Sequence, residues 1–288
     1  MDKVGLILEG GGMRGLYTAG ILDYFMEKDF YTPYVIGVSM GACNATSYVS
    51  KQKKRNKAVT INYVNDPRYL SIKNMFTCKS LLGIDFIYNE IPNTLEPFDF
   101  KNFYNSQQKF IIVATECKTG KAVYFDKDKD DDILTIVRAS SSLPFISPIV
   151  KYNGMELLDG GITDSIPIGK SIKDGNTKNI IILTRPKGYR KEPFKKKRLL
   201  RRFYSGYENL IKAVEHRYRV YNKTLDYIEK LEKENKVFIL RPTDKIKVKR
   251  IEKNTKKLEE LYTMGYKDAE NQYDKMIDWI NNAQKFST

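Results

Sequence analysis

The chain has 288 residues, of which 41% are hydrophobic, enough for one large domain, or one domain with an appendage, around a packed core. Its net charge of +15 favours anionic partners, either phospholipid headgroups or nucleic acid, although a lysine-rich genome explains the same excess. Three widely spaced cysteines and one histidine argue against a disulfide framework and a metal site, so we expect neither a metal nor a cofactor.

The first predicted elements are a strand, a glycine loop and a helix. Residues 4–8 are apolar throughout, as in a buried parallel strand, and residues 16–28 form an amphipathic helix. The loop between them, residues 10–15, matches the Gly-x-Gly-x-x-Gly fingerprint of dinucleotide folds. Such a fold needs an acidic residue after its second strand, but the second strand here, residues 34–38, ends at Ser39. The loop amides fit better as an oxyanion hole that faces this serine.

Ser39 is the centre of the sequence Gly37-Val38-Ser39-Met40-Gly41, which small residues follow. This is the layout of a nucleophile elbow, in which a strand turns sharply into a helix and exposes the serine hydroxyl above the sheet. The N-terminus of that helix stabilises negative charge near the serine. Because neighbouring parallel strands end at the same edge of a sheet, we expect the elbow and the glycine loop to share one cleft.

The middle of the chain contains a second candidate for catalysis. Residues 51–105 hold scattered aromatics, which we interpret as core plus part of a pocket wall, with a lid over an apolar pocket as the alternative. Residues 110–114 and 122–125 then indicate a hairpin, followed by an acidic tract and a helix. A short strand, residues 155–158, ends at Asp159-Gly160-Gly161. This tripeptide is typical of a tight turn, but its place after an apolar strand aims Asp159 at the cleft of Ser39.

The last third of the chain is mostly helical, with strands predicted over residues 180–184 and 237–240. A basic amphipathic segment precedes a helix that extends to about residue 234, and a long helix or helix pair covers residues 251–279. The basic segment suits an anionic membrane surface, with a lysine-rich surface helix as the alternative. Its cationic residues are Lys195, Lys196, Lys197, Arg198, Arg201 and Arg202.

A serine nucleophile needs a neighbouring base. The only histidine is His216, and the order Ser39, Asp159, His216 matches the order of the triad in α/β-hydrolases. However, His216 lies in a charged helical run, whereas a catalytic histidine belongs on a loop beyond a strand. We therefore predict that Asp159 acts directly on Ser39 as a serine-aspartate dyad, with the oxyanion amides carrying more of the stabilisation.

Four motifs occur in the order and spacing of patatin-like phospholipases, and the chain resembles a bacterial member of that family over about residues 4–185. They are Gly-Gly-Gly-x-Arg-Gly at 10–15, Gly-x-Ser-x-Gly at 37–41, the serine- and proline-containing stretch at 139–148, and Asp-Gly-Gly at 159–161. The resemblance implies a three-layer α/β/α sandwich with a mainly parallel sheet, and lipid acyl hydrolase activity without metal or histidine. It implies Ser39 as nucleophile, Asp159 as its base and an oxyanion site around Gly10, Gly11, Gly12 and Arg14, with motif support from Gly15, Gly37, Gly41, Gly160 and Gly161.

These observations predict a patatin-like catalytic core over residues 1–185 and a helical C-terminal extension over residues 186–288 that packs on it. The expected reaction is hydrolysis of phospholipid or other fatty acyl esters, of the phospholipase A or lysophospholipase type. The alternatives are acyl transfer or thioester hydrolysis by the same dyad, and a non-catalytic basic membrane-binding protein; nucleic acid is the disfavoured partner. No segment resembles a signal peptide or the run of about 20 apolar residues that spans a bilayer, so we expect a cytoplasmic protein with at most peripheral contact with the inner membrane face.

Overall fold

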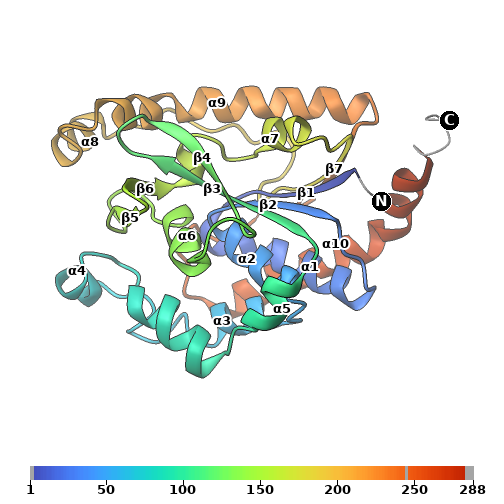
Figure 1. Ribbon diagram of the computed structural model, residues 1–288, viewed down its shortest axis with the longest axis horizontal. Helices are drawn as coiled ribbons and strands as arrows, with labels where there is room; N and C mark the ends of the chain where they lie inside the picture. Colours follow the sequence, from blue (N-terminus) through green and yellow to red (C-terminus); the bar gives the residue numbers. More distant parts are fainter. Residues whose placement is uncertain (1–2, 244–245, 283–288) are drawn as a thin grey trace.

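The computed structural model describes residues 3–243 and 246–282, which form three layers (Figure 1). The middle layer is an eight-stranded sheet in the order β5-β6-β3-β2-β1-β7-β8, with β4 paired to β3. The five strands from β3 to β8 in this order run parallel, whereas β4, β5 and β6 pair in antiparallel fashion. The strands are β1 (Val4–Leu8), β2 (Tyr34–Val38), β3 (Lys109–Glu116), β4 (Lys121–Asp126), β5 (Val150–Tyr152), β6 (Met155–Asp159), β7 (Lys178–Ile182) and β8 (Val237–Leu240).

Strand β1 lies in the interior of the sheet, between β2 and β7. All five of its residues are buried, which explains its unbroken apolar sequence. Its pairing with β2 puts Leu8 opposite Gly37, so the two strands end side by side at their carboxyl ends. The predicted neighbourhood of these strands is therefore confirmed, and the segments that follow them begin at the same edge of the sheet.

Helices cover both faces of the sheet, as predicted for an α/β/α sandwich with a helical C-terminal part. Helices α7 (Ile168–Lys173) and α9 (Glu208–Lys233) lie on one face, and α1 (Leu16–Glu27), α2 (Met40–Val49) and α10 (Thr255–Asn282) lie on the other (Figure 1). Alternate side chains of β1 separate the two cores. Ile7 belongs to the cluster that includes α9, whereas Leu6 and Leu8 belong to the cluster that includes α1 and α10.

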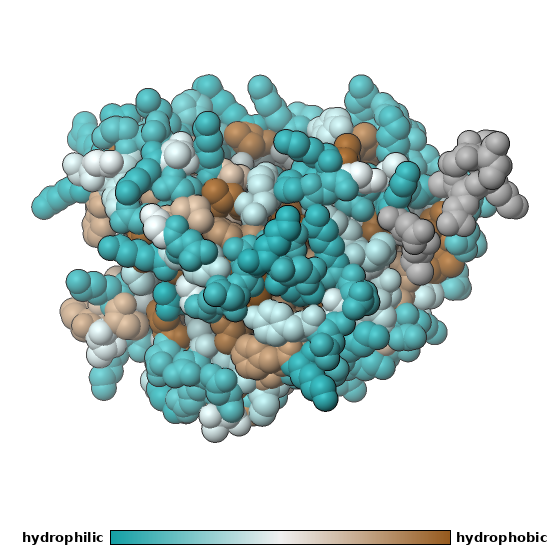
Figure 2. All heavy atoms as spheres, in the orientation of Figure 1, coloured by the Kyte–Doolittle hydropathy of each residue, from teal (hydrophilic) through white to brown (hydrophobic). Residues whose placement is uncertain are grey.

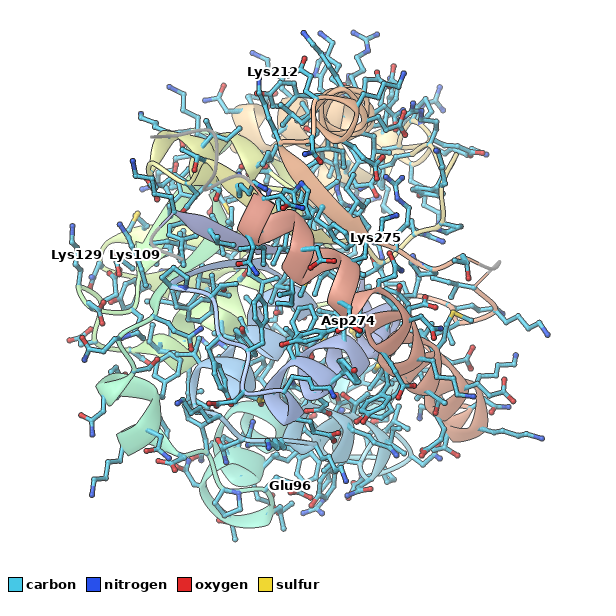
Figure 3. All side chains as sticks on the ribbon, turned by 90° about the vertical axis from the view of Figure 1, so that its right-hand side faces the viewer. Glu96, Lys109, Lys129, Lys212, Asp274 and Lys275 are labelled. Atoms are coloured by element: carbon cyan, nitrogen blue, oxygen red, sulfur yellow. The ribbon has the colours of Figure 1, made fainter. Side chains whose placement is uncertain are left out.

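Helices α1 and α10 cross with their backbones in close contact, and Figure 3 looks onto the side of the molecule where α10 lies across the fold. A Cβ on Gly20 would lie 2.1 Å from the carbonyl oxygen of Tyr262, and one on Gly265 would lie 2.0 Å from that of Tyr17. Tyrosine hydroxyls reinforce the crossing, because Tyr262 donates to Asp23 over 2.8 Å. The C-terminal helix is thus packed directly against the helix that follows the glycine loop.

Residues 51–105 form short helices over one end of the fold, namely α3 (Arg55–Ile61), α4 (Lys73–Thr77), η2 (Phe86–Leu95) and α5 (Phe100–Asn105). Most of their aromatics are buried, including Tyr69, Phe86 and Phe103, in agreement with the core interpretation. Helix α4 differs, because Phe76 in α4 is 86% exposed and Ile72 just before it is 74% exposed. Apolar atoms are visible at its position in Figure 2.

The remaining elements are η1 (Gly12–Gly15), α6 (Ile133–Ser140), η3 (Gly160–Ile162) and α8 (Lys197–Phe203). Strand β5 was not predicted from the sequence, and β7 ends at Ile182 rather than at residue 184. The region expected to contain a long helix or helix pair is a single helix, α10. Within the described ranges, no helix combines the length and apolar character needed to cross a bilayer.

Candidate active site

Ser39 stands at the junction of β2 and α2, where the backbone turns sharply with φ 55° and ψ −127°. A positive φ at a residue with a side chain costs of order 1–3 kcal/mol, so the surrounding structure must hold it in place. The neighbouring backbone does so, because a Cβ on Gly41 would lie 2.3 Å from Leu8 O and one on Gly37 would lie 2.7 Å from Ala42 Cα. The turn can therefore form only with glycine at both positions.

The hydroxyl of Ser140 anchors this turn to the middle of the sheet. Ser39 N donates to Ser140 Oγ over 2.8 Å, and Ser140 Oγ donates to Val113 O over 2.6 Å. Two residues further on, Ser142 O accepts a hydrogen bond of 2.8 Å from Asp159 N. The end of α6 and the turn after it thus hold Ser39 and Asp159 in fixed relative positions.

Asp159 ends β6 and is 1% exposed. Its Oδ1 accepts a 2.8 Å hydrogen bond from Gly161 N, but its buried Oδ2 has no hydrogen-bond partner among the described residues. Burial of an unpaired carboxylate oxygen is costly, so such atoms are rare outside functional sites. A Cβ on Gly160 would lie 2.1 Å from Val113 O, which fixes the turn behind the carboxylate.

Ser39 and Asp159 line one cavity, which we call the polar cavity. Gly10 approaches the serine most closely in this glycine loop, since its Cβ would lie 2.9 Å from Ser39 Cβ. Within the described part of the chain, no hydrogen bond joins the Ser39 hydroxyl to Asp159, and the Gly11 N–H has no acceptor. Among the predicted site residues, the cavity also includes Gly10, Gly11, Gly12, Arg14 and Gly161, whereas Gly15, Gly37, Gly41 and Gly160 lie behind its wall.

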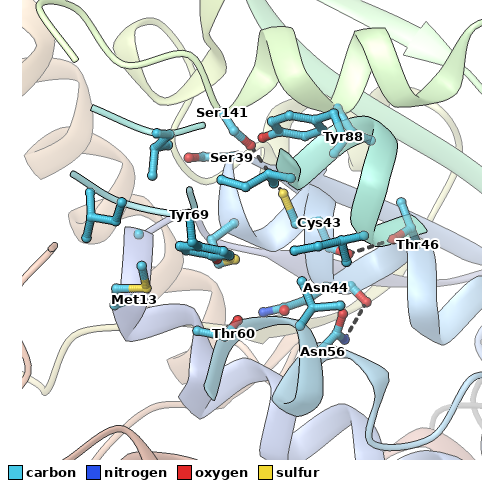
Figure 4. A pocket seen from close by; sticks show the side chains of 18 of the residues that line it. Met13, Ser39, Cys43, Asn44, Thr46, Asn56, Thr60, Tyr69, Tyr88 and Ser141 are labelled. Carbon is cyan, nitrogen blue, oxygen red and sulfur yellow. Dashed lines mark hydrogen bonds between the residues drawn. The ribbon is translucent and has the colours of Figure 1, made fainter. Parts of the chain in front are cut away.

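A second, larger cavity of about 140 Å³ opens from the other side of Ser39, and we call it the apolar cavity (Figure 4). It shares Gly12, Ser39, Leu143 and Arg250 with the polar cavity. Side chains from residues 55–98 line much of it, so this section does form a pocket wall in addition to core. They include Val59, Thr60, Tyr69, Leu70, Leu82, Ile87, Tyr88, Ile91 and Phe98.

Cys43 lies on α2 one turn after Ser39 and lines the apolar cavity (Figure 4). Its Sγ is 3.3 Å from Ser141 Oγ. Burial raises the pKa of the Cys43 thiol, so the group stays protonated and acts as part of an apolar wall rather than as a second nucleophile.

The polar cavity also contains a group of cations that the sequence motifs did not indicate, except for Arg14. We call Arg14, Arg185, Lys191, Arg217 and Arg250 the cationic wall. Arg217 is one residue after His216, on the stripe of α9 that includes the buried residues Val214 and Tyr221. A charged residue at such an apolar position was the signal in the sequence that pointed to it.

His216 itself is exposed and lies outside both cavities; its Nδ1 is 2.8 Å from Lys212 O, one turn earlier in α9. Figure 3 shows Lys212 directed away from the body of the protein. The six cations of the predicted membrane segment lie on and before α8, are exposed and line neither cavity. Their contact with a membrane stays a prediction.

The fold is therefore an α/β/α sandwich with a serine at a strand-to-helix elbow. A family model described as patatin-like phospholipase matches residues 6–170, and the chain belongs to this family. A second model, described as a domain of unknown function (DUF6363), matches residues 207–281. The predicted family and fold are thus confirmed. The second match includes Arg217, so it contributes to the wall of the polar cavity.

Relatives carry names that refer to lipid hydrolysis. The chain is 31% identical to the probable lipid hydrolase 463L of Invertebrate iridescent virus 6, over 60% of this chain and 65% of the viral protein. It is 28% identical to the lysophospholipase NTE1 of Meyerozyma guilliermondii, over 60% of this chain but 12% of the yeast protein. It is also 28% identical to the uncharacterized protein YjjU of Escherichia coli K12, over 83% of this chain and 68% of that protein. The crystal structure of VipD from Legionella pneumophila aligns with a TM-score of 0.49 and 13% identity, over 96% of this chain and 67% of that one.

Proposed function

We propose that this protein is a serine hydrolase of fatty acyl esters in lipids, with Ser39 as nucleophile and Asp159 as its base. The observation that carries the proposal is the buried Asp159 Oδ2, which has no partner among the described residues and belongs to a cavity that also includes Ser39. Membership of the patatin-like phospholipase family and the names of the relatives support lipid esters as the substrate class.

In the proposed reaction, Ser39 Oγ attacks the ester carbonyl carbon while Asp159 accepts the hydroxyl proton. Amides of the Gly10 to Gly12 loop stabilise the negative charge on the tetrahedral oxygen. The bond to the leaving alcohol then breaks, and the alcohol takes the proton from Asp159. In the second half, Asp159 accepts a proton from water, the water oxygen attacks the acyl-enzyme, and Ser39 leaves with the proton. The missing Ser39–Asp159 hydrogen bond is compatible with this role, because such contacts often tighten only when substrate binds.

The apolar cavity supports a fatty acyl chain as the group that is transferred to Ser39. Its lining is mostly aliphatic and aromatic, and it reaches the serine directly. An acyl chain in this cavity places its carbonyl at Ser39 and its alcohol portion on the side of the polar cavity. The two cavities therefore favour an amphiphilic ester as substrate over a small soluble ester.

A fluorophosphonate probe tests the nucleophile without knowledge of the substrate. We expect the probe to label the wild-type protein and His216→Ala, and to label neither Ser39→Ala nor Asp159→Asn, because a serine without its base is a weak nucleophile. Peptide mapping of the labelled protein should place the adduct on Ser39. Loss of labelling in folded His216→Ala would instead support a histidine triad, and labelling of Ser39→Ala at the same rate would disprove the assignment.

The acyl cavity is tested by filling its far part. Val59 lies on α3 and lines the apolar cavity, so Val59→Phe shortens the space for the chain. We expect its kcat/KM for p-nitrophenyl palmitate to fall at least about tenfold more than that for p-nitrophenyl butyrate, since each buried methylene contributes about 0.8 kcal/mol. Val220→Phe makes the same substitution at an exposed position on α9 and should leave the ratio unchanged. Equal losses on both esters would show that the chain binds elsewhere.

A further inference from the structure

The cationic wall gathers five basic side chains around the polar cavity without matching them with carboxylates. Within the described residues, none of the five has a carboxylate oxygen within 4.0 Å. Arg14 is 7% exposed and its Nε has no hydrogen-bond partner there, and the same is true of the buried Nε of Arg217. Buried guanidinium nitrogens without partners are costly, so they indicate that a ligand completes the site.

The two acidic side chains of the cavity do not supply that partner. Both oxygens of Glu9 are already used, since Oε1 accepts from Tyr221 OH over 2.6 Å and Oε2 accepts from Thr184 N over 2.6 Å. Asp159 Oδ1 is used by Gly161 N, and its other oxygen is the proposed base. The wall therefore keeps an excess of positive charge next to Ser39.

Aromatic rings and an amide clamp hold the wall in place before any ligand binds. Lys191 Nζ lies 3.8 Å from the centre of the Tyr221 ring, and the Arg185 guanidinium lies 4.3 Å from that of Tyr189. The side chain of Asn222 on α9 hydrogen-bonds both the N–H and the carbonyl of Lys191, over 2.8 and 3.1 Å. A cavity so constructed binds an anion with little loss of side-chain entropy.

The mutual repulsion of these cations is visible in their acid–base properties. Burial, followed by the charges of Arg185 and Arg250, lowers the pKa of Arg14 to about 10. Burial and the neighbouring charges of Arg217 and Arg250 lower the pKa of Lys191 well below its usual range. An anion in the cavity would relieve this repulsion and favour the charged form of each group.

From this arrangement we infer that the cationic wall binds a phosphate group, and that the lipid substrate carries an anionic phosphate headgroup of the phosphatidic or lysophosphatidic acid class. The inference rests on the proposed function, because it uses Ser39 as the point where the acyl chain and the headgroup diverge. Guanidinium and ammonium groups are the donors that proteins use for phosphate oxygens. A choline headgroup would bring a quaternary cation among five cations, so the wall selects against it.

The first test compares lysophosphatidic acid with lysophosphatidylcholine of the same acyl chain, in mixed micelles of one fixed composition. We expect wild type to show a kcat/KM at least about tenfold higher for lysophosphatidic acid. Arg250→Gln and Lys191→Gln should each remove most of this preference, because each deletes a charge-assisted contact to the phosphate. Lys223→Gln removes an exposed lysine from the same helix as Arg217 and should keep the preference. Equal rates on both lipids in wild type, or equal losses in the variants, would overturn the inference.

A binding measurement separates this inference from the catalytic proposal. Calorimetry with octyl phosphate should show binding that Arg250→Gln weakens at least about tenfold, with octyl glucoside and inorganic phosphate both binding more weakly than octyl phosphate. If octyl phosphate binds in this way but no ester is hydrolysed, the phosphate site stands and the hydrolase proposal fails. If esters are hydrolysed but octyl phosphate binds no better than octyl glucoside, the phosphate site is wrong. Inorganic phosphate that binds as tightly as octyl phosphate would also overturn the lipid assignment.

Discussion

Replacement of Asp159 by asparagine is expected to lower kcat for ester hydrolysis by about 10²–10⁴-fold, the contribution that a positioned general base usually makes. The variant is nearly isosteric, and its amide oxygen can still accept the hydrogen bond from Gly161 N that Asp159 Oδ1 accepts. The turn at the end of β6 should therefore persist while the proton acceptor is lost. The measurement is kcat on p-nitrophenyl butyrate, together with the melting temperature of each protein.

His216→Ala is the control for this experiment, because His216 is exposed and lines neither cavity. We expect it to retain wild-type kcat. If Asp159→Asn melts like wild type and still works within about threefold of its rate, Asp159 is not the base. If both variants lose activity to the same extent, the direct serine-aspartate dyad is wrong.

Gly20→Ala is expected to destabilise the protein by about 3 kcal/mol or more, at the upper end of what overpacking usually costs. The added methyl group would lie 2.1 Å from the Tyr262 carbonyl oxygen, and both partners are helix backbone. The helices α1 and α10 must therefore separate, and the hydrogen bond from Tyr262 to Asp23 would weaken with them. Urea unfolding monitored by circular dichroism measures the change.

Gly169→Ala is the matched control, because it is also a helical glycine but has no atom within 4 Å of the added methyl group. Alanine is favoured over glycine in a helix by about 0.8–1.0 kcal/mol, so this variant should be as stable as wild type or more so. Gly20→Ala gains the same intrinsic preference, and any net loss of stability there comes from the helix crossing. A variant pair with equal unfolding midpoints would mean that α10 does not contact α1 this closely.

The order of elements around Ser39 could be predicted from the sequence because the physical constraints are local. A buried parallel strand needs an unbroken apolar run, and residues 4–8 and 34–38 supply two. A turn with the close contacts seen at Gly37 and Gly41 excludes side chains, so the motif itself marks the place. The hairpin of β3 and β4 and the long α10 follow from the same kind of local pattern.

The cationic wall could not be predicted in the same way, because its members are far apart in the sequence. Arg14 follows β1, Lys191 lies in the segment between β7 and α8, and Arg250 precedes α10. Only the three-dimensional path of the chain brings them to one cavity, and lysine and arginine are so abundant here that no single one is conspicuous. Strand β5 escaped prediction for a different reason, since three residues are too few to show a period.

The contact between Arg250 and the glycine loop also affects how the protein is made. Met13 N donates to Arg250 O over 3.0 Å, and both cavities include Arg250 in their lining. Ribosomes deliver the N-terminal part of a chain first, so Ser39 and Asp159 emerge long before the last side of their cleft exists. A nascent or prematurely terminated chain therefore lacks a finished lipid site, and the cell meets the complete cleft only when synthesis is almost over.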